Sequence, residues 1–151
     1  MPQLPNQYGY FSDDGKEYVI TRADTPMPWI NVIANGDYGF TISQAGSGYS
    51  WRTHASLNRI TRWDQDLIRD EWGKYLYLRD ADTGEFWSPT WQPCGAALEN
   101  YQVRHGMGYS VIEGMHGGIA STVTYFAPMD APCEIWLLRL TNHGETPRRL
   151  Q

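Results

Sequence analysis

Hydrophobic and polar residues alternate along much of this chain, with a period of two positions. The alternation is clearest at residues 119–127, where Ile119, Ser121, Val123 and Tyr125 would share one face of a strand. Successive side chains of a strand point to opposite faces, so this pattern predicts extended structure. Similar patterns, rich in aromatic and β-branched residues, predict further strands at residues 8–11, 17–21, 29–33, 40–43, 101–103, 109–113 and 134–141.

Turn residues separate these predicted strands at short intervals. An Asp-Gly turn at residues 12–16 and an Asn-Gly turn at residues 35–36 predict hairpins, and the glycines of residues 44–49 predict a flexible loop. Residues 53–69 have only partly helical spacing, which predicts a loop with at most a short helix. Many short strands without a convincing long helix predict an all-β fold, an antiparallel β-sandwich.

The stretch KYLYLRDADTGEFWSPTWQP, residues 74–93, has the most informative pattern. Aromatic and aliphatic residues alternate before a polar turn at residues 80–85, and two tryptophans follow it, which predicts a hairpin. Glycoside cleavage normally uses two carboxylates, so the candidate catalytic acids of this stretch are Asp80, Asp82 and Glu85. Asp and Gly at a hairpin tip are ordinary turn residues, however, and we expect a structural role for them.

The carboxyl-terminal residues predict an unfinished hairpin. A polar turn at residues 142–147 follows the strong strand at residues 134–141, and residues 148–151 begin what resembles a return strand. A strand without its partner leaves an unpaired edge, which natural domains avoid. We therefore expect one domain, residues 1–151, truncated at its carboxyl end, in a native protein that continues beyond Gln151.

Composition narrows the class of protein. The 151 residues carry a formal net charge of -5, which argues against a nucleic-acid partner, and no apolar run reaches the roughly 18 residues of a membrane helix. The amino terminus lacks the pattern of a signal peptide, so we expect a cytoplasmic protein in which Cys94 and Cys133 are reduced. The histidines and cysteines lack metal-ligand spacing, so no metal is expected.

Seven tryptophans and ten tyrosines are an unusual share for this length. Aromatic rings can stack on the apolar faces of sugars while arginines bond the hydroxyl groups, so one interpretation is a sugar-binding surface. Its candidates are Trp51, Trp63, Trp87 and Trp91 with Arg52, Arg62 and Arg104. The other interpretation is that most tryptophans fill the core, which we expect of Trp29 and Trp136 because they lie in strong strand patterns. We expect His105 to make a structural hydrogen bond.

Several sequence blocks, together with residues 74–93, resemble the amino-terminal part of the family 94 glycoside phosphorylases. The blocks are PWIN (28–31), NGDYG (35–39), GSGYSW (46–51), NRITRW (58–63), RHGMGY (104–109) and FAPMDAP (126–132). They occur in the family's order and span most of residues 8–150. The family contains cellobiose, cellodextrin, chitobiose and 1,2-β-glucan phosphorylases and the phosphorylase-like region of cyclic glucan synthases, and the blocks do not decide between these branches.

The resemblance implies a β-sandwich of the galactose mutarotase-like or supersandwich type, followed in the family by an (α/α)6 barrel that this chain lacks. It implies reversible phosphorolysis of a β-linked gluco-oligosaccharide to α-glucose 1-phosphate with inversion. Inorganic phosphate would be the co-substrate, and no cofactor is implied. In the family the catalytic aspartate and the main phosphate-binding groups lie in the barrel, so we expect this chain alone to be inactive.

The resemblance also implies where the domain would act. In the family, loops of this domain lie near the mouth of the active site, and some reach the neighbouring subunit of a dimer. The expected substrate-binding residues are therefore Tyr49, Trp51 and Arg52 of the loop at residues 44–52, with Arg104 of a later block. The expected partners are a β-gluco-oligosaccharide, the protein's own barrel and a second subunit. Two alternatives remain: a stand-alone carbohydrate-binding module without catalysis, and a structural interaction domain whose aromatic residues are all buried.

Overall fold

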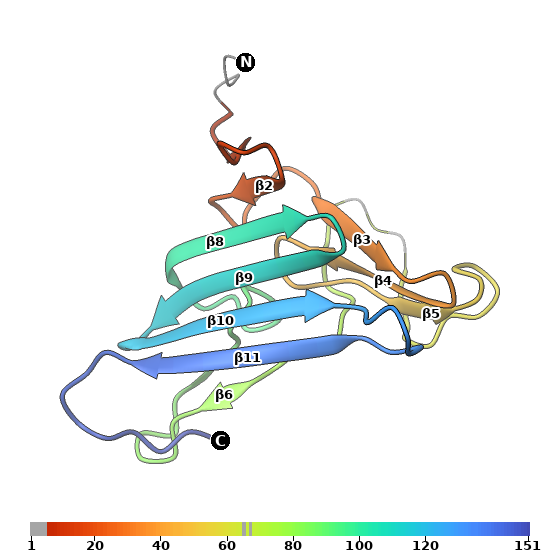
Figure 1. The fold of residues 1–151 in the computed structure, drawn as a ribbon. Helices are drawn as coiled ribbons and strands as arrows, with labels where there is room; N and C mark the ends of the chain where they lie inside the picture. Colours follow the sequence, from red (N-terminus) through yellow and green to blue (C-terminus); the bar gives the residue numbers. More distant parts are fainter. Residues whose placement is uncertain (1–5, 65, 67) are drawn as a thin grey trace.

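The structure, a computed structural model, describes residues 6–64, 66 and 68–151, and this part of the chain contains eleven β-strands (Figure 1). That part contains no helix. Residues 1–5, 65 and 67 lie outside it, and with them part of the amino terminus and two positions of the loop predicted at residues 53–69. The prediction of an all-β fold of antiparallel sheets is confirmed.

Six strands form the larger sheet, in the order β1-β2-β8-β9-β10-β11. They are β1 (Gly9–Phe11), β2 (Glu17–Ile20), β8 (Glu99–Gly106), β9 (Tyr109–His116), β10 (Ile119–Phe126) and β11 (Ile135–Asn142). Buried and half-buried residues alternate along the whole of β10, as its sequence pattern predicts. The sequence pattern of β10 therefore predicts correctly which of its side chains face the interior of the fold.

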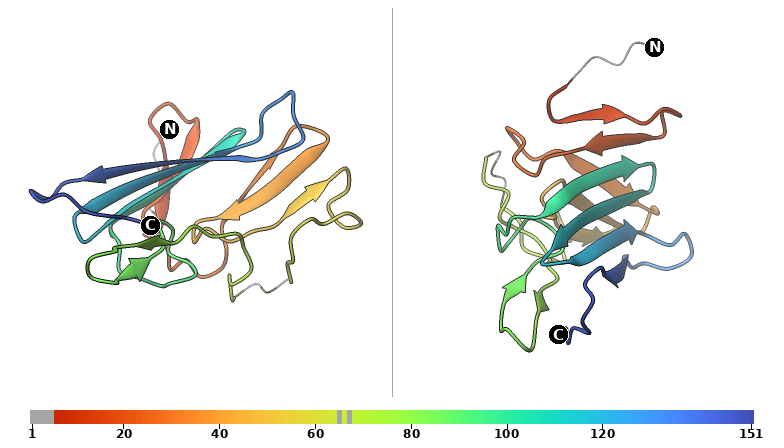
Figure 2. Two further views of the ribbon diagram at one scale, coloured as in Figure 1. Left: turned by 90° about the horizontal axis from the view of Figure 1, so that it is seen from below. Right: turned by 90° about the vertical axis from the view of Figure 1, so that its left-hand side faces the viewer.

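A three-stranded sheet packs against one face of the larger sheet (Figure 2). Its strands are β3 (Ile30–Ala34), β4 (Tyr38–Ser43) and β5 (Ser50–Arg52). Both sheets contribute to the main hydrophobic core, whose buried members are Ile20, Ile33, Tyr38, Phe40, Ile42, Val103, Ile112, Val123 and Tyr125. Trp29 and Trp136 pack against this core, as predicted. Asn31 also joins the sheets, because its amide donates to the carbonyl of Gly106 (2.8 Å).

A short hairpin, β6 (Leu78–Arg79) and β7 (Phe86–Trp87), confirms the turn predicted within residues 74–93. Only two residues of each strand pair. Asp80 closes the turn by accepting hydrogen bonds from the backbone N–H groups of Asp82 (2.8 Å) and Thr83 (3.0 Å). The turn chemistry expected from the sequence therefore accounts for this aspartate.

The end of the chain pairs with this hairpin and not with β11, so the return strand predicted beside β11 is wrong. The backbone N–H groups of Gln151 and Arg79 each donate to the other's carbonyl at 2.9 Å. The turn after β11, closed by a hydrogen bond from the Asn142 amide to the Thr146 carbonyl (2.8 Å), carries the chain across to β6 (Figure 1). The free backbone groups of β6 thereby gain partners that a two-residue hairpin lacks.

The loop at residues 44–49 differs from its prediction as well. Every residue in it except Tyr49 is buried, so the flexible loop suggested by its glycines is a packed one. Gly48 has a φ of 145°, and a Cβ on it would collide with the carbonyl oxygen of Thr41. Glycine is needed there for close approach of two backbones rather than for mobility.

Candidate functional site

An aromatic cluster with an arginine beside it is formed by the residue before β5, by β5 itself and by the segment that follows. The ring of Tyr49 stacks on that of Trp63, with 4.9 Å between ring centres and 30° between planes, and lies 5.3 Å from the ring of Trp51. The guanidinium group of Arg59 lies over the rings of Tyr49 (5.2 Å) and Trp63 (5.3 Å). We call these four residues the aromatic platform. Its three rings are half-buried and Arg59 is exposed, so solvent reaches it.

A glycine on β4 positions the indole ring of Trp51. Gly39 is the cross-strand partner of Trp51, and a Cβ on it would collide with that ring. The missing side chain therefore lets the indole lie close against β4. The next residue, Arg52, is exposed and pairs with Asp37, with 3.1 Å between Nη2 and Oδ2. Trp51 is thus held by packing and Arg52 by charge.

Arg59 is the member of the platform that the sequence analysis did not single out. Its Nε donates to the carbonyl of Ala55 (3.1 Å) and its Nη1 to the carbonyl of Trp63 (3.3 Å). Its backbone forms a β-bridge with Trp51. Arg59 therefore ties the loop after β5 to the platform, and the sequence signal for it was its place in the block NRITRW, four residues before Trp63.

Arg104 lies on β8, away from the platform. His105 points into the sandwich, where Nε2 donates to the carbonyl of Trp29 (3.1 Å) and Nδ1 accepts from the hydroxyl of Ser110 (2.8 Å). This is the structural role expected of His105, and burial lowers its pKa. Alternation along the strand places Arg104 on the opposite, outer face, where it pairs with Glu113 at 3.4 Å. The structure therefore brings Tyr49 and Trp51 together, whereas Arg52, the next residue of β5, points to the opposite face of its sheet. Arg104 lies on another surface.

The other candidate tryptophans separate into buried and accessible ones. Trp87 is only 1% exposed and packs with Leu78 and Ile119 in a second core, so its candidacy as a sugar contact is overturned. Trp91 is half-buried and, with Gln92, lines a cavity of about 300 Å³. Position in the sequence did not distinguish these two tryptophans, although they lie only four residues apart.

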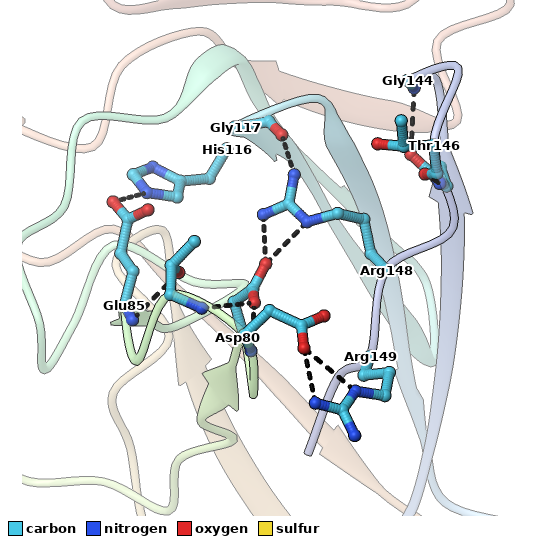
Figure 3. Close-up of polar contacts among 11 residues, drawn as sticks. Asp80, Glu85, His116, Gly117, Gly144, Thr146, Arg148 and Arg149 are labelled. Carbon is cyan, nitrogen blue, oxygen red and sulfur yellow. Dashed lines mark hydrogen bonds and ion pairs between the residues drawn. The ribbon is translucent and has the colours of Figure 1, made fainter.

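The acidic residues of the β6–β7 hairpin are engaged by cations from elsewhere in the chain (Figure 3). The pairs are Asp80–Arg148, Asp82–Arg149 and Glu85–His116. The two backbone N–H donors of the turn, and then Arg148, lower the pKa of Asp80. A general acid must hold a proton until it reacts, so an aspartate kept ionised in this way is suited to structure and not to catalysis.

The described residues give little support for a metal site or a membrane-spanning segment. No group of three or more His, Cys, Asp and Glu residues there could hold a metal ion. The same residues form no helix with the length and apolarity of a membrane span. Cys94 and Cys133 are free thiols. The aromatic platform is the arrangement best suited to a ligand, because flat rings beside a fixed guanidinium group match a sugar ring and its hydroxyls.

Known proteins resemble this chain over nearly its whole length. It is 39% identical over 146 residues to the N,N'-diacetylchitobiose phosphorylase of Vibrio furnissii. It is 39% identical over 147 residues to the solabiose phosphorylase of Paenibacillus borealis, and 38% identical over 143 residues to the 3-O-β-D-glucopyranosyl-β-D-glucuronide phosphorylase of that organism. Each alignment covers 95% of this chain but only 18%, 19% and 17% of the respective relative, so the chain spans less than a fifth of their length.

A family model confirms the resemblance found in the sequence blocks. Residues 16–151 match the supersandwich domain of glycosyl hydrolase 94, a range that includes every strand of the fold except β1. The matched range also includes the whole aromatic platform and the hairpin with its ion pairs. The chain therefore belongs to the supersandwich domain family of glycosyl hydrolase 94.

Proposed function

We propose that this chain is the amino-terminal domain of an inverting β-glycoside phosphorylase, and that its aromatic platform contacts the acceptor sugar. The observation that carries the proposal is the solvent-accessible stack of Tyr49, Trp51 and Trp63 beside Arg59, in a domain whose relatives are named as phosphorylases of disaccharides and glycosides. A stacked aromatic surface offers an apolar face to a sugar ring, while Arg59 offers a donor to its hydroxyls.

The whole protein would cleave a β-linked gluco-oligosaccharide with inorganic phosphate and release α-glucose 1-phosphate. Phosphate is already nucleophilic, so the reaction needs one protein carboxylic acid to protonate the departing oxygen. We assign that acid and the main phosphate contacts to a barrel domain outside this chain, and we expect this chain alone to be inactive. The two aspartates of the β6–β7 hairpin are bound to arginines and Glu85 to His116, which supports this division of labour.

Three further expectations belong to this proposal. The domain would pack against its own barrel and take part in a homodimer, with the platform facing the mouth of the active site. No cofactor would be needed beyond phosphate as co-substrate. The free thiols Cys94 and Cys133 are consistent with a reducing compartment, which supports a cytoplasmic location.

Replacement of Trp51 by Ala in the full-length protein tests the role of the platform. In the synthetic direction, with α-glucose 1-phosphate as donor, we expect the KM for the acceptor to rise about tenfold, because one stacking contact is lost. Leu57→Ala is the matched control: Leu57 lies in the same segment and is 85% exposed, so its loss should leave KM unchanged. An unchanged KM in Trp51→Ala would remove the acceptor role.

The cavity beside Trp91 supports a second candidate function, a carbohydrate-binding module that acts without catalysis. Its volume of about 300 Å³ and its lining by Trp91, Gln44 and Gln92 offer an aromatic face and amide groups to a hydroxyl-rich ligand. Titration calorimetry of the 151-residue chain with β-gluco-oligosaccharides separates the two candidates. Binding that Trp91→Ala abolishes would favour the module, whereas no binding by the chain alone would favour the phosphorylase domain.

A further inference from the structure

The strands of the β6–β7 hairpin are anchored by two buried side chains, Leu78 and Trp87, whereas its turn is held to the rest of the fold by charge. The hairpin pairs over only two residues per strand, too few for a hairpin that is stable by itself. Its two aspartates bind the arginines at residues 148–149, and Glu85 binds His116 at the end of β9 (Figure 3). Arginine stays charged at any ordinary pH, so His116 is the only one of these cations that titrates near neutrality.

Both ring nitrogens of His116 face groups that can only accept a proton. Nε2 lies 2.9 Å from Oε1 of Glu85, and Nδ1 lies 3.1 Å from the carbonyl oxygen of Ala97. The ring also lies against the buried Trp87, with 5.0 Å between ring centres, which limits its reorientation. A neutral imidazole carries one N–H and loses one of these bonds in either tautomer, whereas the imidazolium donates both.

The charges around His116 favour the imidazolium. Glu85 faces it from the hairpin and Glu99 acts on it from the start of β8, while Arg148 donates to the carbonyl of the adjacent Gly117 (3.1 Å). Burial lowers the pKa of His116, but the hydrogen bonds to Glu85 and Ala97 and the two negative charges outweigh it. The pKa is therefore raised above its ordinary value.

We propose that His116 is a pH-dependent clasp, which holds the β6–β7 hairpin closed when its imidazolium spans Glu85 and Ala97 and loosens it when the ring loses a proton. A group whose pKa is raised on folding makes its full contribution to the stability of the folded state at pH values below its unfolded pKa, which is about 6.5 for histidine. That stabilisation is lost as pH rises through the folded pKa. Asp80 remains bound to Arg148 in both states, so the loosening is confined to the turn and the adjoining residues 149–151.

Hydrogen–deuterium exchange of the full-length protein, measured at about pH 6, at about pH 8 and at steps between them, tests the clasp once the rates are corrected for intrinsic exchange. The exchange rates of the amides of residues 81–87, normalised to those of β10, should be about fivefold higher at pH 8 than at pH 6. That ratio corresponds to the loss of one partly exposed ion pair. His116→Gln has no titrating ring and should exchange rapidly at both pH values. Glu85→Gln removes the charge that favours the imidazolium and should move the loosening to lower pH.

Equal exchange of residues 81–87 at both pH values in the unaltered protein would overturn the proposal. So would a pH dependence that persists unchanged in His116→Gln. The amides of β10 report whether each variant keeps its fold. If His116→Gln does not fold, the Glu85→Gln variant decides, because an unshifted midpoint would contradict the clasp.

Discussion

Replacement of Trp87 by Ala is expected to destabilise the protein by about 4 kcal/mol. A tryptophan side chain buries on the order of 200 Å², and at about 25 cal/mol per Å² its removal from water contributes about 5 kcal/mol, of which alanine retains a part. Trp87 is 1% exposed and is packed against Leu78 and Ile119. Measured large-to-small substitutions of buried aromatic residues fall at about 3–5 kcal/mol, in agreement with this value.

The assay is urea unfolding of the chain followed by far-ultraviolet circular dichroism, which does not depend on the removed fluorophore. Phe86→Ala is the matched control, because Phe86 is the other residue of β7 and is 63% exposed. We expect it to change the free energy of unfolding by less than about 0.5 kcal/mol. If Trp87→Ala leaves too little folded protein to measure, Trp87→Phe retains one ring and should cost about 2 kcal/mol. Equal effects of the alanine substitutions at the two positions would refute the burial of Trp87.

Three further outcomes follow from groups that the fold buries. Gly48→Ala should lower the free energy of unfolding by more than about 1 kcal/mol in urea titrations, because its Cβ collides with the carbonyl of Thr41 at a positive φ. Lys74→Met should cost about 3 kcal/mol because it leaves Glu134, whose side chain is only 12% exposed, without its cation, and the double variant with Glu134→Leu should recover most of that loss. Burial lowers the pKa of His105, so as pH falls the unfolded chain binds a proton at this ring at a higher pH than the folded chain does. The free energy of unfolding should therefore fall as pH drops below about 6.5. Melting temperatures measured across this range should lose most of that dependence in His105→Gln, and a slope unchanged by the substitution would contradict a buried neutral ring.

The strands and their faces were largely predictable, because alternation and turn chemistry are local. The pattern at residues 119–127 identified the inward residues of β10, and Asn35 and Gly36 marked the turn between β3 and β4. His105 and the aspartates at the hairpin tip also have the structural roles expected of them. The sequence blocks were sufficient to indicate the family.

Burial was predicted less well, because it depends on which distant segment covers a residue. The glycines at residues 44–49 suggested mobility, yet the loop is enclosed, and its Gly46 lies against Thr90 from a segment more than forty positions away. Trp87 and Trp91 have similar sequence surroundings, but only Trp87 is covered by a core that includes Ile119 of β10. A local pattern carries no information about such partners.

The sequence by itself determined the all-β class, the positions of most strands and the family, since these depend on residue periods, turn residues and ordered blocks. Only the tertiary structure decided that Arg59 joins Tyr49 and Trp63 in one platform while Arg104 faces elsewhere. It also decided that the chain's last residues pair with β6 and that His116 meets Glu85. The contacts of the chain's end and of His116 join segments far apart in the chain, and those of the platform depend on how an irregular loop folds back on β5, so packing of the whole fold selects all of them.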